Sequence, residues 1–214
     1  MSNLCHELHQ FCSLLLRLRF PFEEEDIPGN GVYILFEEGE TAHGTDRIVR
    51  IGSHTGQNKL SSRLREHFTN ENKDRSVFRK NIGRALLNRD GDPFLKYWEL
   101  DLTTRQSREK YQALIDPAKQ LDVERRVTEY VRSHFSFVVF QVDEQQRRLA
   151  LEKKLISTVS LCDECVPSGN WLGLHSPKPE IRQSGLWQTN ELYKRPLTKD
   201  ELAELKVLIS GKRG

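Results

Sequence analysis

The segment that most constrains the fold runs from residue 48 to residue 67 and reads IVRIGSHTGQNKLSSRLREH. Its apolar residues alternate with polar partners at first, which predicts a strand, and the β-rich run VYILF at 32–36 predicts an earlier one. A polar stretch between the two strands indicates a hairpin with a long tip. Leu60, Leu64 and Phe68 then recur every four residues, so we expect a helix directly after the hairpin.

The other elements follow from the same periodicities. Amphipathic spacing predicts a leading helix that Pro21 ends, and a capping box of Thr198 and Glu201 opens a final helix that stops at Gly211. A buried strand is predicted at 135–142 from its β-branched and aromatic residues. We further predict helices at 3–19, 76–88, 111–134 with a break at Pro117, and 143–160, and a strand at 94–102.

The composition is that of a polar globular protein. Its 214 residues are 36% hydrophobic and 30% charged, and no apolar run approaches the ~20 residues of a membrane span. His6, Glu7 and His9 precede the apolar run LLLRLRF, and no small-residue cleavage site follows it, which disfavours a secretory signal. We therefore expect one domain with extensions, in the cytoplasm and with no membrane role.

Basic charge is concentrated in one part of the chain. The formal net charge is only +2, yet residues 63–89 hold eight basic residues against three acidic ones. With Arg79, Lys80 and Arg84 largely outward on the predicted helix, this cluster is typical of a surface that binds a phosphate backbone. A solvated helix face is the alternative.

The four cysteines give little indication of a site. Cys162 and Cys165 form one CxxC pair, and neither a second pair nor nearby histidines complete the four ligands of a structural zinc site. A redox role would require a thioredoxin-like context, which the pattern lacks. Ordinary reduced thiols are therefore the expectation for these two and for Cys5 and Cys12.

Two of the predicted helices hold candidate catalytic or ligand-binding residues. Arg63 and His67 lie one turn apart beside the apolar stripe, where a guanidinium can bind phosphate and an imidazole can move a proton near neutral pH. An exposed basic turn is the alternative. Glu152 lies on a stripe between Leu149 and Ile156, so its carboxylate requires a partner such as a metal ion or a guanidinium. A structural ion pair is the alternative and, for this position taken alone, the simpler interpretation.

The strands place further polar residues on defined faces. Tyr33 and Leu35 point to one face of the first strand, and Val32, Ile34 and Phe36 point to the other. The simplest interpretation of Tyr33 is a packed side chain whose hydroxyl has a hydrogen-bond partner. Arg50, Gly52 and His54 share a face of the second strand, where the glycine permits close approach of a backbone or a ligand.

These residues occur in a recognisable order. Gly31-Val32-Tyr33 comes first, followed by Arg50-Ile51-Gly52, by Arg63 and His67 on the next helix, by Glu152 on a late helix, and by Asn170. The order resembles the GIY-YIG nuclease superfamily, which includes homing, repair and restriction endonucleases, and the resemblance covers about residues 28–175.

The resemblance implies an α+β fold with a small, mainly antiparallel β-sheet flanked by helices. It also implies hydrolysis of phosphodiester bonds in DNA with one divalent ion, Mg²⁺ or Mn²⁺, per active site. Tyr33 matches the tyrosine that helps activate water, Arg63 the arginine that stabilises phosphate charge, and Glu152 the metal-binding carboxylate. His67 matches a histidine of some restriction-type members, and Asn170 a late asparagine near the scissile phosphate.

The sequence departs from the family pattern at Arg50, which replaces the tyrosine of the second motif. Arg50 could contact phosphate or act as the cation that promotes ionisation of Tyr33, and His54 could assist proton transfer. We predict nucleic-acid contacts for Gly52, His54, Arg79, Lys80 and Arg84. Glu152-Lys153-Lys154 also matches the E-x-K of another nuclease class, but that motif requires a strand and this segment has helical spacing.

The expected organisation is a nuclease domain at 28–175 with a helical insertion near 103–133. Helical extensions at 1–27 and 176–214 flank it, and the insertion and the tail are candidates for target recognition or dimerisation. A homodimer would suit an enzyme that makes double-strand breaks. Restriction, repair and mobile-element roles stay open, as does a nucleic-acid-binding module that kept the fold and lost the chemistry.

Overall fold

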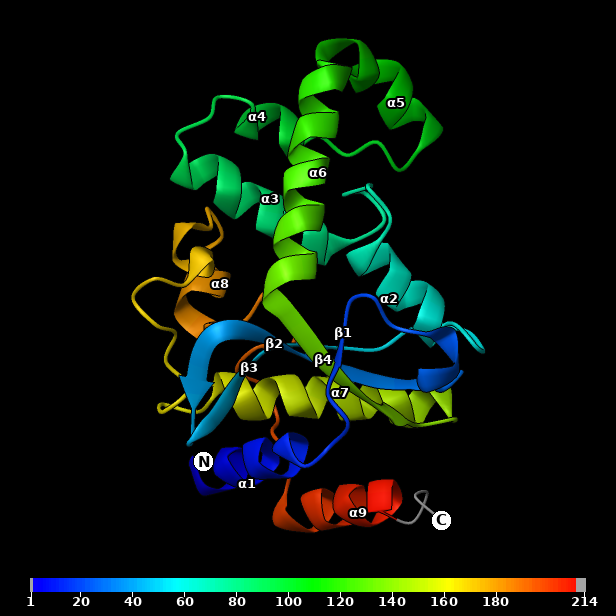
Figure 1. Cartoon of the computed structure of the whole chain (residues 1–214), viewed down its shortest axis with the longest axis vertical. Helices are drawn as coiled ribbons and strands as arrows, with labels where there is room; N and C mark the ends of the chain where they lie inside the picture. Colours follow the sequence, from blue (N-terminus) through cyan, green and yellow to red (C-terminus); the bar gives the residue numbers. More distant parts are fainter. Residues whose placement is uncertain (1, 211–214) are drawn as a thin grey trace.

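A four-stranded antiparallel sheet forms the centre of the computed structural model, which describes residues 2–210 (Figure 1). The strand order is β1-β4-β2-β3. The strands are β1 (Leu18–Arg19), β2 (Gly31–Ala42), β3 (Thr45–Gly52) and β4 (Phe135–Gln141). The predicted α+β fold with a small antiparallel sheet flanked by helices is confirmed.

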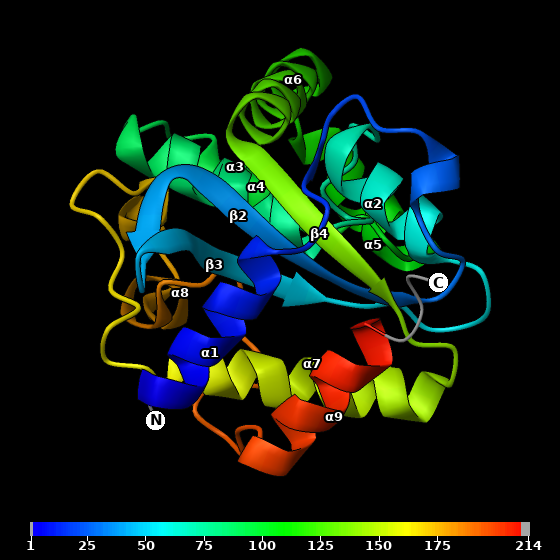
Figure 2. The same ribbon diagram turned by 60° about the horizontal axis from the view of Figure 1, so that its bottom comes forward.

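Helices cover both faces of the sheet (Figure 2). One face packs against α1 (Ser2–Ser13), α7 (Gln145–Ser160) and α9 (Lys199–Ser210). The other packs against α2 (Leu60–Phe68), α3 (Val77–Arg89) and α6 (Pro117–His134). Shorter elements are η1 (Glu24–Asp26), α4 (Leu95–Trp98), α5 (Arg105–Tyr111), η2 (Gln112–Leu114), η3 (Leu172–His175) and α8 (Pro179–Ser184). Among residues 2–210, no helix combines the length and the apolar character needed to cross a membrane.

Alternation along β2 divides its side chains between two hydrophobic cores. Val32, Ile34 and Phe36 pack with α1, α7 and α9. Tyr33 and Leu35 pack with α2, α3 and α6. Because successive side chains of a strand point to opposite faces, a tyrosine at position 33 must enter the second core. The predicted assignment of these residues to faces is confirmed.

The β2–β3 hairpin is longer than predicted, and its tip is shorter. β2 continues to Ala42 and β3 starts at Thr45, so the turn consists of His43 and Gly44, both with positive φ. Such a turn matches the twist of paired strands. The prediction of a long tip was wrong because the polar residues of this stretch remain in the strand, where the carboxylate of Glu40 forms a buried ion pair with Arg47.

Other boundaries also differ from the predictions. Residues 94–102 form no strand, because α4 packs against α3, with Trp98 fully buried over Gly83. The leading helix ends at Ser13, not at residue 19, and β1 follows it. The capping box of Thr198 and Glu201 is confirmed by reciprocal hydrogen bonds of 2.9 and 3.2 Å. The predicted stop at Gly211 lies outside the described residues.

The basic residues of α3 do not form an outward surface. Arg79 is fully buried and pairs with Glu124 at 2.8 Å. Arg84 is 8% exposed and donates two hydrogen bonds of 2.6 Å to Glu99. Lys80 is partly buried and donates to the Glu99 carbonyl. The prediction that these cations face outward was therefore wrong for Arg79 and Arg84, because α3 is buried between α4, α6 and the sheet.

We expect Arg79→Ala to destabilise the fold by about 3–5 kcal/mol, because it leaves the Glu124 carboxylate buried without its cation. Urea denaturation would measure the change. Arg105→Ala is the matched control, since Arg105 pairs with Glu109 on the surface with side chains 89% and 63% exposed. Its effect should stay below about 1 kcal/mol. Equal losses in the two variants would contradict the structural role of Arg79.

Candidate active site

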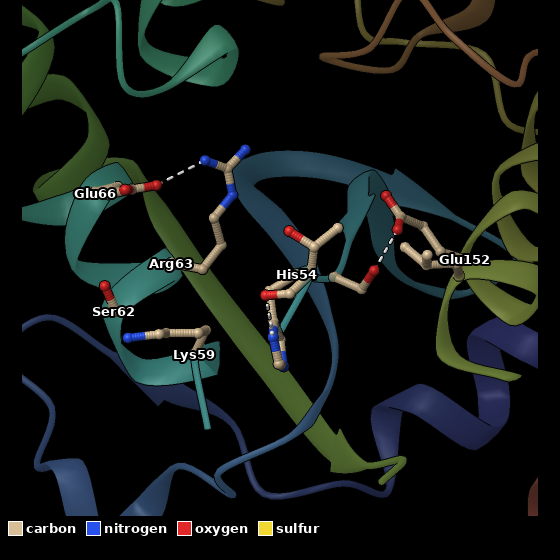
Figure 3. A pocket seen from close by; sticks show the side chains of 9 residues that line it. His54, Lys59, Ser62, Arg63, Glu66 and Glu152 are labelled. Atoms are coloured by element: carbon tan, nitrogen blue, oxygen red, sulfur yellow. Dashed lines mark hydrogen bonds and ion pairs between the residues drawn. The ribbon is translucent and has the colours of Figure 1, made fainter. Parts of the chain in front are cut away.

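A polar cavity of about 380 Å³ opens where the end of β3 meets α2 and α7 (Figure 3). Arg63 and Glu66 reach it from α2, and Glu152 reaches it from α7 on the opposite side. Its lining consists of Ser53, His54, Thr55, Lys59, Ser62, Arg63, Glu66, Leu149 and Glu152. The cavity therefore combines cations with a carboxylate from two distant parts of the sequence.

The local sequence explains why α2 presents these groups. Leu60, Leu64 and Phe68 are fully buried and fix one face of the helix against the core. The flanking positions then point to either side of this apolar stripe. His67 is fully buried beneath the helix, while Arg63 is about a quarter exposed in the cavity wall. The expected proximity of Arg63 and His67 is thus realised at the boundary between the core and the cavity.

A chain of hydrogen bonds links Tyr33 to the start of α3. The Tyr33 hydroxyl lies 2.7 Å from His67 Nε2, and His67 Nδ1 lies 2.8 Å from Ser76 Oγ. Ser76 is the N-cap of α3 and also accepts a bond from the Arg79 amide. In the tautomer with the proton on Nδ1, His67 donates to Ser76 and its Nε2 accepts from Tyr33.

Gly52 makes room for the Tyr33 hydroxyl. The two residues are paired in the sheet, and a Cβ at position 52 would lie 2.2 Å from the hydroxyl oxygen. No side chain fits at that distance. Gly52 was predicted as a nucleic-acid contact through close backbone approach, and in the structure the group that approaches it is Tyr33.

Burial and nearby cations keep His67 neutral. Burial lowers the pKa of His67 well below its usual range, and Arg63, Arg50 and Arg79 lower it further. For Arg63, burial acts to lower the pKa, but Tyr33 and Glu66 outweigh it and the pKa is raised. Arg63 is therefore a permanent cation that interacts directly with Tyr33. The sequence had suggested Arg50 for that position.

Arg63 is held in place by protein groups but remains accessible. Its Nη1 donates to Glu66 at 2.7 Å and to the Arg75 carbonyl at 3.1 Å. A guanidinium has five N–H donors, so several remain for a phosphate in the cavity.

Glu152 faces the same cavity as a partly buried carboxylate. It accepts a hydrogen bond from the Ser53 hydroxyl, and within residues 2–210 it makes no ion pair. The guanidinium partner that the sequence left open is therefore absent from the described contacts. Of the two carboxylates that line the cavity, Glu66 is paired with Arg63, and Glu152 is left to fit Mg²⁺, which keeps several waters and takes its remaining ligands from one or two carboxylates and the substrate phosphate.

Arg50 and His54 lie near the cavity but are engaged elsewhere. Arg50 shares a sheet face with Tyr33, and its Nη1 donates to the Trp187 carbonyl at 2.6 Å. His54 lines the cavity, yet its Nε2 accepts from the Gly31 amide at 3.3 Å and its Nδ1 lies 3.4 Å from the Thr55 carbonyl. Burial, followed by Arg148, lowers the pKa of His54. His54 thus forms part of the cavity wall, whereas Arg50 anchors the backbone at Trp187.

Asn170 is not brought to this cavity. It is exposed and lines a separate cavity of about 420 Å³, together with Glu40 and Trp171. Ser168 holds the segment there by donating its amide to Glu40. The structure therefore does not group Asn170 with Tyr33, Arg63 and Glu152.

Several polar residues of the site were missed in the sequence, among them Thr55 and Glu66 of the cavity lining. Ser53 bonds Glu152, Ser76 bonds His67, and Lys59 and Ser62 line the cavity. The helix predicted at 76–88 already began at Ser76, which has an N-cap residue type, but nothing local indicated its bond to His67. The role of Ser53 carried no local signal, because its partner is 99 positions away.

The family model of the GIY-YIG domain matches residues 3–213, so the chain belongs to the GIY-YIG family. No curated protein and no solved structure matches the chain. Family membership indicates nuclease activity in general, and GIY-YIG nucleases generally use divalent metal ions. The match extends through both predicted extensions, and the proposed domain boundaries stay a prediction.

The depressed pKa of His67 predicts a pH dependence of stability. Below pH ~6.5 an unfolded chain protonates this histidine while the folded chain does not, so the free energy of unfolding falls by up to about 1.4 kcal/mol per pH unit. His67→Gln removes this contribution. Urea denaturation between about pH 7 and pH 5 should show the wild type losing more stability than the variant. If the difference in free energy of unfolding between the wild type and the variant stayed constant over this pH range, the buried imidazole would not be neutral in the folded protein.

Proposed function

We propose that this protein is a metal-dependent endonuclease that hydrolyses phosphodiester bonds in DNA. The observation that carries the proposal is the Tyr33–His67 hydrogen bond of 2.7 Å beside a cavity that holds Arg63 and Glu152. Phosphodiester hydrolysis requires a proton acceptor, stabilisation of phosphoryl charge and a site for a divalent ion. Arg63 and Glu152 line the cavity, and Arg63 interacts with Tyr33 of the buried pair behind it, so the three functions adjoin one another.

Tyr33 and His67 form the proton path in this proposal. The neutral imidazole accepts the phenol proton at Nε2, and the Tyr33 oxygen accepts a proton from the attacking water. Ser76 fixes the imidazole orientation through Nδ1. Because Arg63 and burial lower the pKa of His67, the proton is held there only transiently, while the Arg63 cation stabilises the negative charge on Tyr33.

Arg63 and Lys59 bind the substrate's phosphate. Both line the cavity, and Arg63 offers bidentate donors to the nonbridging oxygens, whose charge grows in the transition state. Lys59 is exposed at the start of α2 and adds a cation at the cavity mouth. These contacts are made to the sugar-phosphate backbone of the DNA, so they do not distinguish one base sequence from another.

Glu152 holds the divalent ion, with Ser53 orienting its carboxylate. A bound Mg²⁺ or Mn²⁺ would supply charge neutralisation at the phosphate and the leaving oxygen. Within the described residues this carboxylate is paired with no guanidinium, and the hydrogen bond from Ser53 does not neutralise its charge. A restriction-type role is compatible with this site, and so are repair and mobile-element roles.

A binding module that kept the fold and lost the chemistry is the competing hypothesis. It would bind DNA with the same cations but would have no need of the Tyr33–His67 pair or of Glu152. Catalysis measured with and without the metal therefore separates the two functions.

We expect the purified protein to convert supercoiled plasmid to nicked or linear DNA in the presence of Mg²⁺, and to be inactive in the presence of a chelator. Glu152→Gln should reduce the rate by about a thousandfold or more, because it removes the carboxylate for the ion. Glu144→Gln is the matched control, since Glu144 precedes the same helix and makes no side-chain capping bond. Wild-type activity of a folded Glu152→Gln protein would refute the metal site, and DNA binding without any cleavage would favour the binding module.

We expect Tyr33→Phe to slow cleavage by about 100-fold or more while leaving DNA affinity within about twofold, because it removes one hydroxyl and keeps the ring packing. Single-turnover rates and filter binding would measure the two effects. Tyr97→Phe in α4 is the control, because it removes a phenol hydroxyl that lies outside the candidate active site. Equal rates for Tyr33→Phe and the wild type would exclude Tyr33 from the proton path.

A further inference from the structure

A cluster of thiols and imidazoles lies at the turn of the β2–β3 hairpin, away from the candidate active site. Cys5 comes from α1, His43 from the turn itself, and Cys162 and Cys165 from the segment after α7. Figure 2 shows the N-terminal end of α1 and the hairpin turn on the same side of the molecule. Segments that are far apart in the sequence thus converge on one point.

The ligand atoms are close enough to share one ion. Cys5 Sγ lies 3.4 Å from Cys165 Sγ, and His43 Nε2 lies 3.4 Å from both Cys162 Sγ and Cys165 Sγ. Atoms of Cys5, His9, His43 and Cys165 all lie within 4.8 Å of one another. Tetrahedral zinc with its usual bond lengths separates its ligand atoms by roughly 3.3–3.8 Å.

The cysteines are free thiols, and their side chains are buried. Burying several thiols against two imidazoles is unusual unless the group has a common function, because each thiol forms only weak hydrogen bonds. Thiolate and imidazole are the preferred ligands of zinc, and tetrahedral sets of them are typical of structural zinc sites.

His9 and Cys162 compete for the fourth position. Both nitrogens of His9 already have backbone partners, since Nδ1 donates to the Cys5 carbonyl at 2.9 Å and Nε2 accepts from the Ile48 amide at 3.2 Å. His9 thereby satisfies a buried backbone group of β3, and binding a metal through Nε2 would break that bond. Cys162 has no such competing role and forms with Cys165 the CxxC spacing of zinc sites.

His43 has the surroundings of a metal-bound histidine. Its Nε2 faces the thiols, and its buried Nδ1 has no hydrogen bond within the described part of the chain but lies 3.3 Å from the Glu164 carboxylate. Histidines that bind a metal through one nitrogen usually direct the other toward a carboxylate or a carbonyl.

We propose that Cys5, His43, Cys162 and Cys165 bind one Zn²⁺ ion as a closed structural site. The ion ties α1, the hairpin turn and the segment after α7 together, and His9 packs against it. Four protein ligands leave no open position for a substrate, so this ion has no part in phosphodiester cleavage. The site is independent of Glu152 and of the proposed nuclease function.

The first experiment uses the full chain purified without a metal-affinity step and without chelators. Elemental mass spectrometry should find about one zinc ion per chain. Replacement by Co²⁺ should give the visible bands of a tetrahedral site and a thiolate charge-transfer band whose intensity corresponds to three thiolates. A strong chelator should lower the melting temperature by several degrees. Metal-free protein that takes up neither ion, or a Cys5–Cys165 disulfide in freshly purified protein, would overturn the proposal.

The second experiment assigns the ligands. Cys5→Ser, Cys162→Ser, Cys165→Ser and His43→Asn should each lose most of the zinc, with asparagine chosen because it tolerates the positive φ at position 43. Cys12→Ser is the matched control, since Cys12 is buried on the same helix and lies outside the cluster. Cys12→Ser, His9→Gln and Glu152→Gln should retain zinc. Loss in His9→Gln with retention in Cys162→Ser would overturn the assignment of the fourth ligand. The Co²⁺ spectrum of the wild type decides the question if ligand variants do not fold.

Discussion

The position of Tyr33 between Gly52 and His67 is the constraint on which the rest of the site depends. The register of β2 and β3 places the tyrosine opposite a residue without a Cβ, and the hydroxyl then reaches the imidazole of α2. A slip of one residue in this register would move Tyr33 to the other face of the sheet, into the core with α1 and α7. The hairpin therefore fixes both the fold and the alignment of the Tyr33–His67 pair.

Buried cations connect stability to chemistry in this protein. Arg79 pairs with Glu124 in the core between α3 and α6, and its positive charge also contributes to the low pKa of His67. Its Nη1 donates to the His67 carbonyl as well. The interaction that holds α3 to α6 thus helps to keep the imidazole uncharged, so that its Nε2 stays free to accept the hydrogen bond of Tyr33.

Much of the fold could be predicted from local sequence, because the 2.0 and 3.6 periodicities are local. They placed Tyr33 on its face, Leu60 and Leu64 in a helix, and Glu152 on a later one. Long-range pairing was not predictable: the sequence shows Arg79 as a basic residue on a helix, and only its partner 45 positions away makes it a core group. Asn170 and the cluster around His43 depend in the same way on how distant segments pack.

Under the proposed nuclease function, the cavity that holds Arg63 and Glu152 would act on one scissile phosphate at a time. Within the described residues it presents one carboxylate without a protein cation, and Glu66 is already committed to Arg63. The strands of a duplex run in opposite directions, so one chain in one orientation can attack only one of them. With that function, cutting both strands in a single binding event would require a second copy related by twofold symmetry, whereas a lone chain would release nicked DNA first.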